Sequence, residues 1–203
     1  SGLTRVRGFS QDDAHVFCTP EQASDEFALF LEMTREVYDA FGFADVSVAV
    51  ETRPEKFLGS VELWDEAERT LQDGLRAAGF PFTVNPGDGA FYGPKIAFNF
   101  RDALRRSWTL STIQIDCAMP DRFGVSYVRP DGTEGRPTML HRAVLGSIER
   151  FIGILVEHTA GDFPLWLAPV QVRVLNVTDR AAEFAQQVRV ALEHAGVRAE
   201  VDL

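Results

Sequence analysis

Apolar side chains recur at helical spacing in two long stretches of the first half of the chain. Residues 19–41 begin with Thr-Pro-Glu-Gln, which supplies a capping residue, a first-turn proline and a capping-box partner. Residues 64–78 carry a single apolar stripe, and a glycine directly follows each stretch as a stop signal. We therefore predict two amphipathic helices. Between them, valines alternate with small or polar residues over 46–50, which predicts a half-buried strand.

The middle of the chain has the pattern of strands followed by a third helix. Residues 80–84, 96–100 and 108–117 are predicted strands, and the Pro-Asp-Gly turn at 130–132 predicts a hairpin. A longer helical pattern opens at His141 and closes at Gly161. Its apolar stripe consists of Leu145, Ile148, Phe151, Ile152 and Leu155.

The pattern changes after the proline-bounded segment 164–169. Residues 170–177 read as a nearly continuous apolar strand, a helix follows that ends at Gly196, and residues 197–203 begin another strand. This β-α-β order implies a parallel pair of strands. A unit of this size cannot bury its own core, and residues 3–9 have strand character without a preceding partner. We therefore expect both ends to be cut relative to a longer natural protein.

The composition fits a folded protein without a membrane-spanning segment. The 203 residues are 45% hydrophobic, 11% aromatic and 25% charged, which provides for a packed core and argues against disorder. No stretch approaches the roughly 20 apolar residues of a membrane helix. The start of the chain also lacks the apolar core of a signal peptide. We expect a soluble, cytoplasmic globular protein.

Net charge and cysteine content narrow the function classes. Thirty acidic against 20 basic residues give a formal net charge of −10. This charge argues against a protein whose whole surface coats nucleic acid, although a local basic patch is compatible with it. Cys18 and Cys117 form neither a disulfide framework nor a C-x-x-C motif. We interpret them as reduced thiols and leave metal ligation open.

Polar and charged side chains gather in four segments that also contain apolar residues. In the first, alternation along an extended chain would place six side chains on one side: Arg5, Arg7, Phe9, Gln11, Asp13 and His15. The guanidinium and aromatic groups suit an anionic ligand that carries a ring. The carboxylate and imidazole at the other end suit an amine or a hydroxyl. A solvated edge strand is an equally good interpretation.

The second and third segments also allow two interpretations. Residues 89–95 form a glycine-rich turn that carries a phenol, Tyr92, and an ammonium, Lys95, but ordinary hairpin turns have the same composition. In the third segment three polar side chains share one strand face: Thr112, Gln114 and Asp116. A polar face in an otherwise apolar sheet indicates a wet cleft, although an outer face fits as well.

The fourth segment falls on the predicted third helix. It carries His141 and, about two turns further on, Ser147 and Arg150 one turn apart. A single histidine at a helix start is usually structural, and a helix arginine more often joins a surface ion pair than binds a phosphate. No segment therefore identifies a function on its own.

Taken together, in this order and at these separations, the four segments resemble threonyl-tRNA synthetase, most closely its bacterial form. The matching stretches are Arg-Val-Arg-Gly-Phe-Ser-Gln-Asp-Asp-Ala-His, Ala-Phe-Tyr-Gly-Pro-Lys, Ser-Thr-Ile-Gln-Ile-Asp and His-Arg-Ala-Val-Leu-Gly-Ser-Ile-Glu-Arg-Phe. The stretch Pro-Leu-Trp-Leu-Ala-Pro-Val-Gln resembles that family's junction with its anticodon-binding domain. The resemblance covers essentially the whole chain.

The resemblance implies a fold class and a division into domains. The expected class is α+β: a class II aminoacyl-tRNA synthetase-like antiparallel sheet flanked by helices, followed by the first β-α-β of an α/β anticodon-binding domain. Residues 1–167 would be part of the catalytic domain, including motif 3, and residues 168–203 part of the anticodon-binding domain. The full-length protein would be a homodimer.

On the amino-acid side, the resemblance implies zinc-based selection of threonine. His15 and His141 match two histidine ligands, and the third ligand, a cysteine, is expected upstream of this chain. Three protein ligands leave room for the amino and hydroxyl groups of threonine. Valine lacks the hydroxyl and could not complete the chelate. The positions that match threonine-binding residues are Gln11, Asp13, Tyr92, Lys95 and Gln114.

On the nucleotide side, the resemblance implies ATP and Mg²⁺. The positions that match ATP-binding residues are Arg5, Phe9, Thr112, Ser147 and Arg150. Phe9 would stack on adenine. Arg5 and Arg150, the expected catalytic residues, would neutralise charge on the phosphates as the threonine carboxylate attacks the α-phosphorus. The adenylate would then pass threonine to a terminal ribose hydroxyl of tRNA(Thr).

Three positions depart from the usual pattern of the family. Thr109 stands where glutamine is common, Cys117 replaces a usual phenylalanine and Thr138 a usual valine. These changes motivate one alternative, an active copy that resists a natural inhibitor. A separate alternative is a truncated, non-catalytic paralogue that binds tRNA or another ligand. Drift in packing would also explain these changes.

Overall fold

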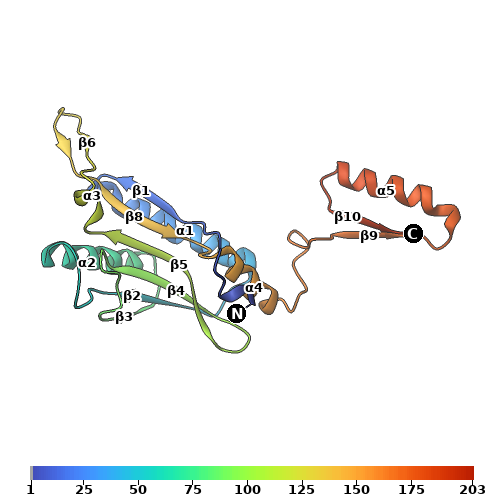
Figure 1. Ribbon diagram of the computed structural model, residues 1–203, viewed down its shortest axis with the longest axis horizontal. Helices are drawn as coiled ribbons and strands as arrows, with labels where there is room; N and C mark the ends of the chain where they lie inside the picture. The colour runs from blue at the N-terminus through green and yellow to red at the C-terminus, as the bar shows by residue number, and fades with distance from the viewer. Residues whose placement is uncertain (1) are drawn as a thin grey trace. The chain divides into compact units, whose positions relative to one another are not determined.

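The computed structural model describes residues 2–203, which divide into two compact units, one ending at Leu155 and the other running from Val156 to Leu203. The first unit contains a six-stranded sheet with the order β1-β8-β5-β4-β2-β3 (Figure 1). Its strands are β1 (Ala14–Cys18), β2 (Val46–Glu51), β3 (Phe82–Asn85), β4 (Lys95–Arg101), β5 (Ser107–Asp116) and β8 (Thr138–Ala143). Neighbouring strands are antiparallel except β2 and β3, which are parallel.

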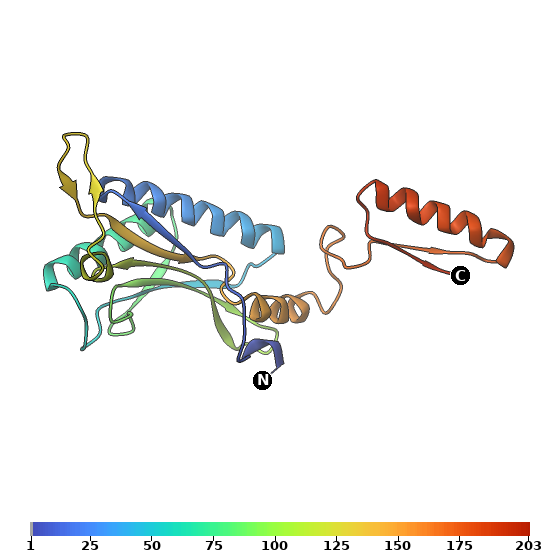
Figure 2. The same cartoon turned by 45° about the horizontal axis from the view of Figure 1, so that its top comes forward.

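Two helices cover one face of this sheet, as their apolar stripes predict. Helix α1 (Ala23–Phe41) packs on β5 and β8, and α2 (Val61–Ala77) packs on β2 and β4 (Figure 2). The core beneath them includes fully buried Trp64, Phe98 and Ile113. Each such side chain contributes roughly 1.5–3 kcal/mol through its removal from water.

The signals at the helix ends have the expected effect. The side chain of Gln22 accepts a hydrogen bond from the backbone N–H of Thr19 at 3.0 Å, so the predicted capping-box partner is confirmed. A 3₁₀ turn (Pro20–Gln22) precedes α1, and Gly42 ends this helix in the left-handed conformation at φ 72°. Helix α2 begins three residues before the expected stripe because the side chain of Ser60 caps it.

Two predictions for the first unit are wrong. His141 does not open a helix, because it lies in β8, where backbone pairing with both β1 and β5 satisfies its peptide groups. The helix, α4 (Ile148–His158), begins only after Gly146, whose φ of 68° interrupts helical geometry. Residues 3–9 are not a strand, because no neighbouring strand pairs with them. Residues 3 and 4 instead belong to a 3₁₀ turn (Gly2–Thr4), and residues 5–9 are irregular chain.

Smaller elements complete the first unit at the end of β5. Helix α3 (Met119–Arg122) is a single turn. It is followed by the predicted hairpin of β6 (Tyr127–Val128) and β7 (Glu134–Gly135). This hairpin projects beyond the main sheet (Figure 1).

The second unit is the predicted β-α-β arrangement. Strand β9 (Val172–Leu175), a 3₁₀ turn (Asp179–Ala181), helix α5 (Ala182–His194) and strand β10 (Ala199–Asp202) follow one another, and the two strands are parallel. From 156 to 203 only Ala185 is buried, while Val177 is 98% and Phe184 68% exposed. As expected from its size, this unit does not bury a core of its own.

A search of residues 2–203 for a helix that could cross a membrane finds none with the necessary length and apolarity.

Candidate active site

A row of polar side chains crosses the sheet on the face opposite the two helices. His15 of β1 lies opposite His141 of β8, and His141 lies opposite Gln114 of β5. Gln114 in turn lies opposite Lys95 of β4, which lies opposite Glu51 of β2. Side chains of directly opposite residues point to the same face of a sheet. Strand register thus brings together four of the predicted site residues that are far apart in the sequence.

We use the name histidine end for His15, His141 and Gln114 of this row together with Tyr92 of the glycine-rich turn. The rings of His15 and His141 are 4.4 Å apart, edge to face, and the ring of Tyr92 is 5.3 Å from His141. The Tyr92 hydroxyl donates a hydrogen bond to Oε1 of Gln114. His141 Nε2 lies 2.8 Å from Asp116 Oδ2, which fixes the orientation of the imidazole.

Asp116 holds the imidazole of His141 in place. The sequence predicted it on the polar strand face but not in the site. Its side chain is fully buried and also accepts hydrogen bonds from the backbone N–H groups of Ala118 and Met119 at 2.9 and 2.8 Å. Burial alone would raise the pKa of Asp116, but the bond from His141 and the two backbone bonds outweigh it and lower that pKa. The carboxylate therefore stays charged.

Tyr92 keeps its proton. Burial raises the pKa of its phenol first, and the negative charges of Asp116 and Asp13 raise it further. The hydroxyl is therefore a hydrogen-bond donor throughout the neutral range. Asp13 is exposed, but it is close enough for its charge to act on this phenol.

The glycine-rich turn places Tyr92 and Lys95 because it packs directly on the end of β5. A Cβ on Gly93 would lie 1.8 Å from the carbonyl oxygen of Ile115, so only glycine fits there. The Tyr92 carbonyl accepts a hydrogen bond from the N–H of Cys117 at 2.8 Å. The interpretation as an ordinary hairpin turn is therefore too simple, since the turn is fitted to the strand that carries Gln114.

Lys95 is held by a residue that the sequence analysis missed. Its Nζ lies 2.5 Å from Oε2 of Glu51, and the two side chains are only 23% and 14% exposed. Glu51 follows the alternating valines of β2, and its face could have been found by extending that alternation to the next residue. At this end of the row, the carboxylate of Glu51 therefore balances the charge of the Lys95 ammonium.

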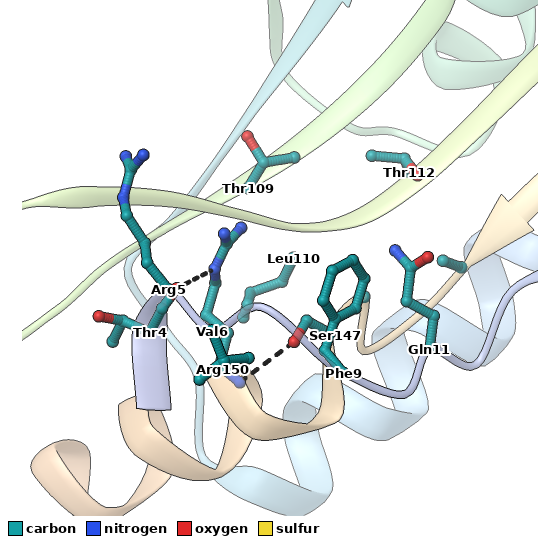
Figure 3. A pocket seen from close by; sticks show the side chains of 12 residues that line it. Thr4, Arg5, Val6, Phe9, Gln11, Thr109, Leu110, Thr112, Ser147 and Arg150 are labelled. Carbon is teal, nitrogen blue, oxygen red and sulfur yellow. Dashed lines mark hydrogen bonds between the residues drawn. The ribbon is translucent and has the colours of Figure 1, made fainter. Parts of the chain in front are cut away.

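A cavity of about 400 Å³ lies beside the histidine end. Figure 3 shows Arg5, Phe9 and Arg150 pointing toward the strand that carries Thr109 and Thr112. The residues that line the cavity are Thr4, Arg5, Val6, Phe9, Gln11, Thr109, Leu110, Thr112, Ala143, Gly146, Ser147 and Arg150. All five residues predicted to bind ATP are among them, together with Gln11. We call the part around Arg5 and Arg150 the arginine end.

Asp12, which the sequence analysis did not single out, joins the N-terminal segment to the loop before α4. Its carboxylate accepts hydrogen bonds from the backbone N–H groups of Val144, Leu145 and Gly146 at 2.7, 2.9 and 2.9 Å. Next to it, Gln11 and Ser147 form an isolated β-bridge. These bonds keep Phe9 and Gln11 beside Ser147 and Arg150 although no regular strand contains them.

A β-bulge in β5 brings Thr109 into the cavity wall. Opposite β4, Thr112 pairs with Ala97 and Thr109 with Asn99, so three steps on β5 face two on β4. Bulges of this kind redirect a side chain. The Thr109 hydroxyl donates to Oδ1 of Asn99 at 2.7 Å. Strict alternation from Thr112 would not have placed it on this face.

The other two unusual positions do not line the cavity. Cys117 is 5% exposed, and burial, followed by the charges of Asp116 and Glu68, raises the pKa of its thiol to about 12. Thr138 lies opposite Cys18 at the end of β8. Among the three departures from the family pattern, only Thr109 contacts this cavity.

The histidine end could supply part of the donor set of a zinc site. Two imidazoles lie side by side, and one is oriented by a buried carboxylate, an arrangement typical of metal-ligating histidines. The Asp116 bond to Nε2 leaves Nδ1 of His141 for a metal. Within residues 2–203, no group of three or more His, Cys, Asp or Glu side chains is arranged to hold a metal ion. His15 and His141 thus fit two positions of such a site.

Comparison with known proteins now defines the class. The tRNA synthetase class II core domain (G, H, P, S and T) matches residues 1–159. The chain therefore belongs to this family, whose antiparallel sheet flanked by helices is the one described above. The class II fold predicted from the sequence is confirmed.

Within this class the similarity is to threonine–tRNA ligases. Those of Methylococcus capsulatus and Thiobacillus denitrificans are 54% and 55% identical over 202 residues, all of this chain, which spans 32% of their length. A crystal structure described as the RNA binding domain of threonyl-tRNA synthetase from Cryptosporidium parvum is 42% identical with a TM-score of 0.95. The match includes 100% of this chain and 51% of that chain.

Proposed function

We propose that this chain is part of a threonine–tRNA ligase. The observation that carries the proposal is the cavity that collects Arg5, Phe9, Thr112, Ser147 and Arg150, in a chain similar over its whole length to such ligases. Residues 1–167 would contribute to the catalytic domain and residues 168–203 to the anticodon-binding domain. The enzyme would act in the cytoplasm, and its full-length form would be a homodimer.

The arginine end would bind ATP with Mg²⁺. Phe9, which is 54% exposed, offers a ring face for adenine, while Thr112 and Ser147 offer hydroxyl groups. Arg5 and Arg150 would hold the phosphates and neutralise the charge that develops during transfer. A carboxylate oxygen of threonine attacks the α-phosphorus, the bond to the bridging oxygen breaks, and pyrophosphate leaves with that electron pair.

The histidine end would bind threonine. His15 and His141 would hold the zinc ion, which when bound supplies a Lewis-acid site for the amino and hydroxyl groups of the amino acid. Asp13 can accept a hydrogen bond from either group, and Tyr92, still protonated, orients Gln114. Gln11 lines the wall shared with the arginine end. Lys95 of β4 lies opposite Gln114 and would contact threonine from that side.

The second step would transfer threonine to tRNA(Thr). A terminal ribose hydroxyl of the tRNA attacks the carbonyl carbon of the threonyl-adenylate, and AMP leaves. Thr112, which lines the cavity, and Gln114 of the histidine end are only two residues apart on β5, which supports both steps at one place. Binding energy from the rest of the tRNA would be spent on aligning its terminal ribose.

The test is threonine-dependent ATP–pyrophosphate exchange by the natural chain that contains these 203 residues, with valine and serine as controls. We expect exchange with threonine, little with serine and none with valine. Replacement of Arg150 by alanine should lower the exchange rate about a hundredfold. The matched control is Arg76→Ala, which removes a surface ion pair with Asp73 on α2.

The other outcomes distinguish the alternatives. A folded, zinc-loaded protein without exchange would favour the non-catalytic paralogue that binds tRNA or another ligand. Full exchange that persists under an inhibitor of ordinary threonine–tRNA ligases would favour the resistant copy. Thr109, the unusual residue in the cavity wall, would be the first position to revert in either case.

A further inference from the structure

The indole of Trp108 lies against three guanidinium groups beside the cavity. The Cζ atoms of Arg5, Arg106 and Arg150 are 5.8, 5.5 and 5.3 Å from the centre of its ring system. At these distances the electron-rich face of an indole attracts a cation. Arg5 and Arg150 also line the cavity. One aromatic ring therefore contacts both arginines to which we assign a catalytic role.

A buried carboxylate holds this indole in place. Trp108 Nε1 donates a hydrogen bond to Oδ2 of Asp102 at 2.8 Å, and the side chain of Asp102 is completely buried. The same carboxylate accepts bonds from Arg106 Nε at 2.6 Å and from the backbone N–H groups of Leu104 and Arg106 at 2.9 and 2.8 Å. With four donors around it, the carboxylate cannot rotate without breaking bonds in a buried position.

Asp102 is ionised, and its negative charge lies close to the guanidinium groups around Trp108. Burial by itself would raise the pKa of this carboxyl, but the bond from Trp108 and those from Arg106 outweigh it and lower that pKa. The group is therefore an anion next to a set of like-charged guanidiniums. It offsets part of their mutual repulsion before any phosphate is bound.

Comparison with the other tryptophan of this unit shows that Trp108 does not merely fill the core. Trp64 is fully buried, donates its N–H to the carbonyl of Leu58 at 2.7 Å and packs on Phe57. Trp108 is only half-buried, and guanidinium groups lie over its ring. Arg150 has a further bond from its Nε to the carbonyl of Thr4 at 3.1 Å, so its guanidinium is held from two sides.

We propose that Trp108 is a positioning residue for ATP, which together with Asp102 holds the guanidiniums of Arg5 and Arg150 at the cavity before the nucleotide arrives. The inference rests on the proposed function, since it assigns the phosphates of ATP to this cavity. Groups that are fixed in advance need no reorganisation when charge develops in the transition state. Trp108 touches no reacting atom and acts only through the two arginines.

Kinetics of two substitutions test the role. Trp108→Leu removes the aromatic face, and we expect the KM for ATP in pyrophosphate exchange to rise about tenfold. The KM for threonine should change less than about twofold, because the histidine end is held by strand pairing. Trp108→Phe keeps an aromatic face but loses the donor to Asp102, so it should restore most of the affinity, to within about threefold of the wild type.

A double substitution separates positioning from general damage. If Trp108 acts through Arg150, replacing Arg150 by alanine should cost much less in the Trp108→Leu background than in the wild type. The matched control is Phe82→Leu, which removes the ring under Arg76 at 5.5 Å, away from the cavity. It should leave both KM values unchanged. Equal KM values for ATP in the wild type and Trp108→Leu would overturn the inference.

A second readout does not depend on activity. In NMR spectra of the 203-residue chain, the side-chain Nε–H resonances of Arg5 and Arg150 should carry a ring-current shift that Trp108→Leu abolishes and Trp108→Phe reduces. Unchanged resonances would overturn the inference even in an active enzyme. If the natural chain shows no exchange but the resonances shift as expected, the proposed function fails while the held arginines stand.

Discussion

The two ends of the site are built by different means. At the histidine end, His15, His141 and Gln114 are opposite one another on paired strands, so backbone hydrogen bonds fix their positions. At the arginine end, Arg5 and Arg150 come from an irregular segment and from the first turn of a helix, and side-chain contacts with Trp108 bring them together. In both cases a buried aspartate lies behind the ring: Asp116 behind an imidazole and Asp102 behind an indole.

This difference bears on how each end can respond to change. A strand register is all-or-none, because a slip of one residue turns every side chain to the other face. Stacked guanidiniums can shift by small amounts at modest cost, since each contact is worth about 1 kcal/mol. The histidine end should therefore be rigid and intolerant of backbone change, and the arginine end should tolerate it. The proposed selection of threonine over similar amino acids needs the rigidity of the histidine end.

The largest effect is expected from Gly93→Ala at the histidine end. The new Cβ would overlap the carbonyl oxygen of Ile115, at 1.8 Å, and neither group is a flexible side chain that could move away. We expect a loss of stability of about 3 kcal/mol, which corresponds to a fall in Tm of about 6–12 °C for a chain of this length. Thermal unfolding followed by circular dichroism measures it.

Gly8→Ala is the matched control at the arginine end. A Cβ at Gly8 meets no heavy atom within 4 Å, so its Tm should stay within about 2 °C of the wild type. If Gly93→Ala were equally harmless, the turn would not be fitted to β5, and the proposed rigidity of the histidine end would be wrong.

A smaller effect is expected from Asp12→Asn, at the junction of the two ends. The asparagine keeps one acceptor oxygen, but its NH₂ group would face N–H donors that now bond to the carboxylate of Asp12. We expect a loss of about 2 kcal/mol in the free energy of unfolding, measured with urea. Asp13→Asn, at the exposed neighbouring carboxylate, should change it by less than about 0.5 kcal/mol. Equal losses would contradict the role given to Asp12.

The sequence predicted the arrangement of the histidine end better than that of the arginine end. Alternation along a strand is a local pattern, whereas the arginine end depends on contacts between residues that are distant in the sequence. Alternation along β5 correctly placed Gln114 on a polar strand face, and pairing with β8 then put His141 next to it. His141 itself was assigned to a helix, because the apolar stripe beyond it extends the helical pattern backwards. Nothing in local periodicity could show that Asp12 would hold a loop more than 130 residues away.

The bulge is a second feature that periodicity could not predict. It gives β5 one residue more than β4 between Thr109 and Thr112, and a single sequence contains no signal for the register of its partner strand. Trp108 was likewise predicted only as the start of a strand, and the sequence analysis did not single out Asp102. Their importance depends on arginines that are distant in the sequence and reach them through tertiary structure.

The smallest expected effect is the response of the two ends to acid, which should be alike and is tested with Asp102→Asn and Asp116→Asn. In both wild-type carboxyls, hydrogen bonds outweigh burial and lower the pKa in the folded state. A lowered folded pKa means that the ionised form stabilises the fold above the unfolded pKa of about 4, and that this stability is lost as the pH falls toward the folded pKa.

Each variant should therefore be less stable than the wild type by a constant amount above about pH 5, and this gap should narrow below about pH 4, by roughly 1 kcal/mol. Urea unfolding at pH 3, 4, 5 and 7 measures the gap. Asp73→Asn, which removes only an exposed ion pair with Arg76, should lower stability by less than about 1 kcal/mol. If acid closed the gap for Asp116→Asn but not for Asp102→Asn, the anion beneath Trp108 would contribute nothing to the fold. The arginine end would then depend on the indole alone.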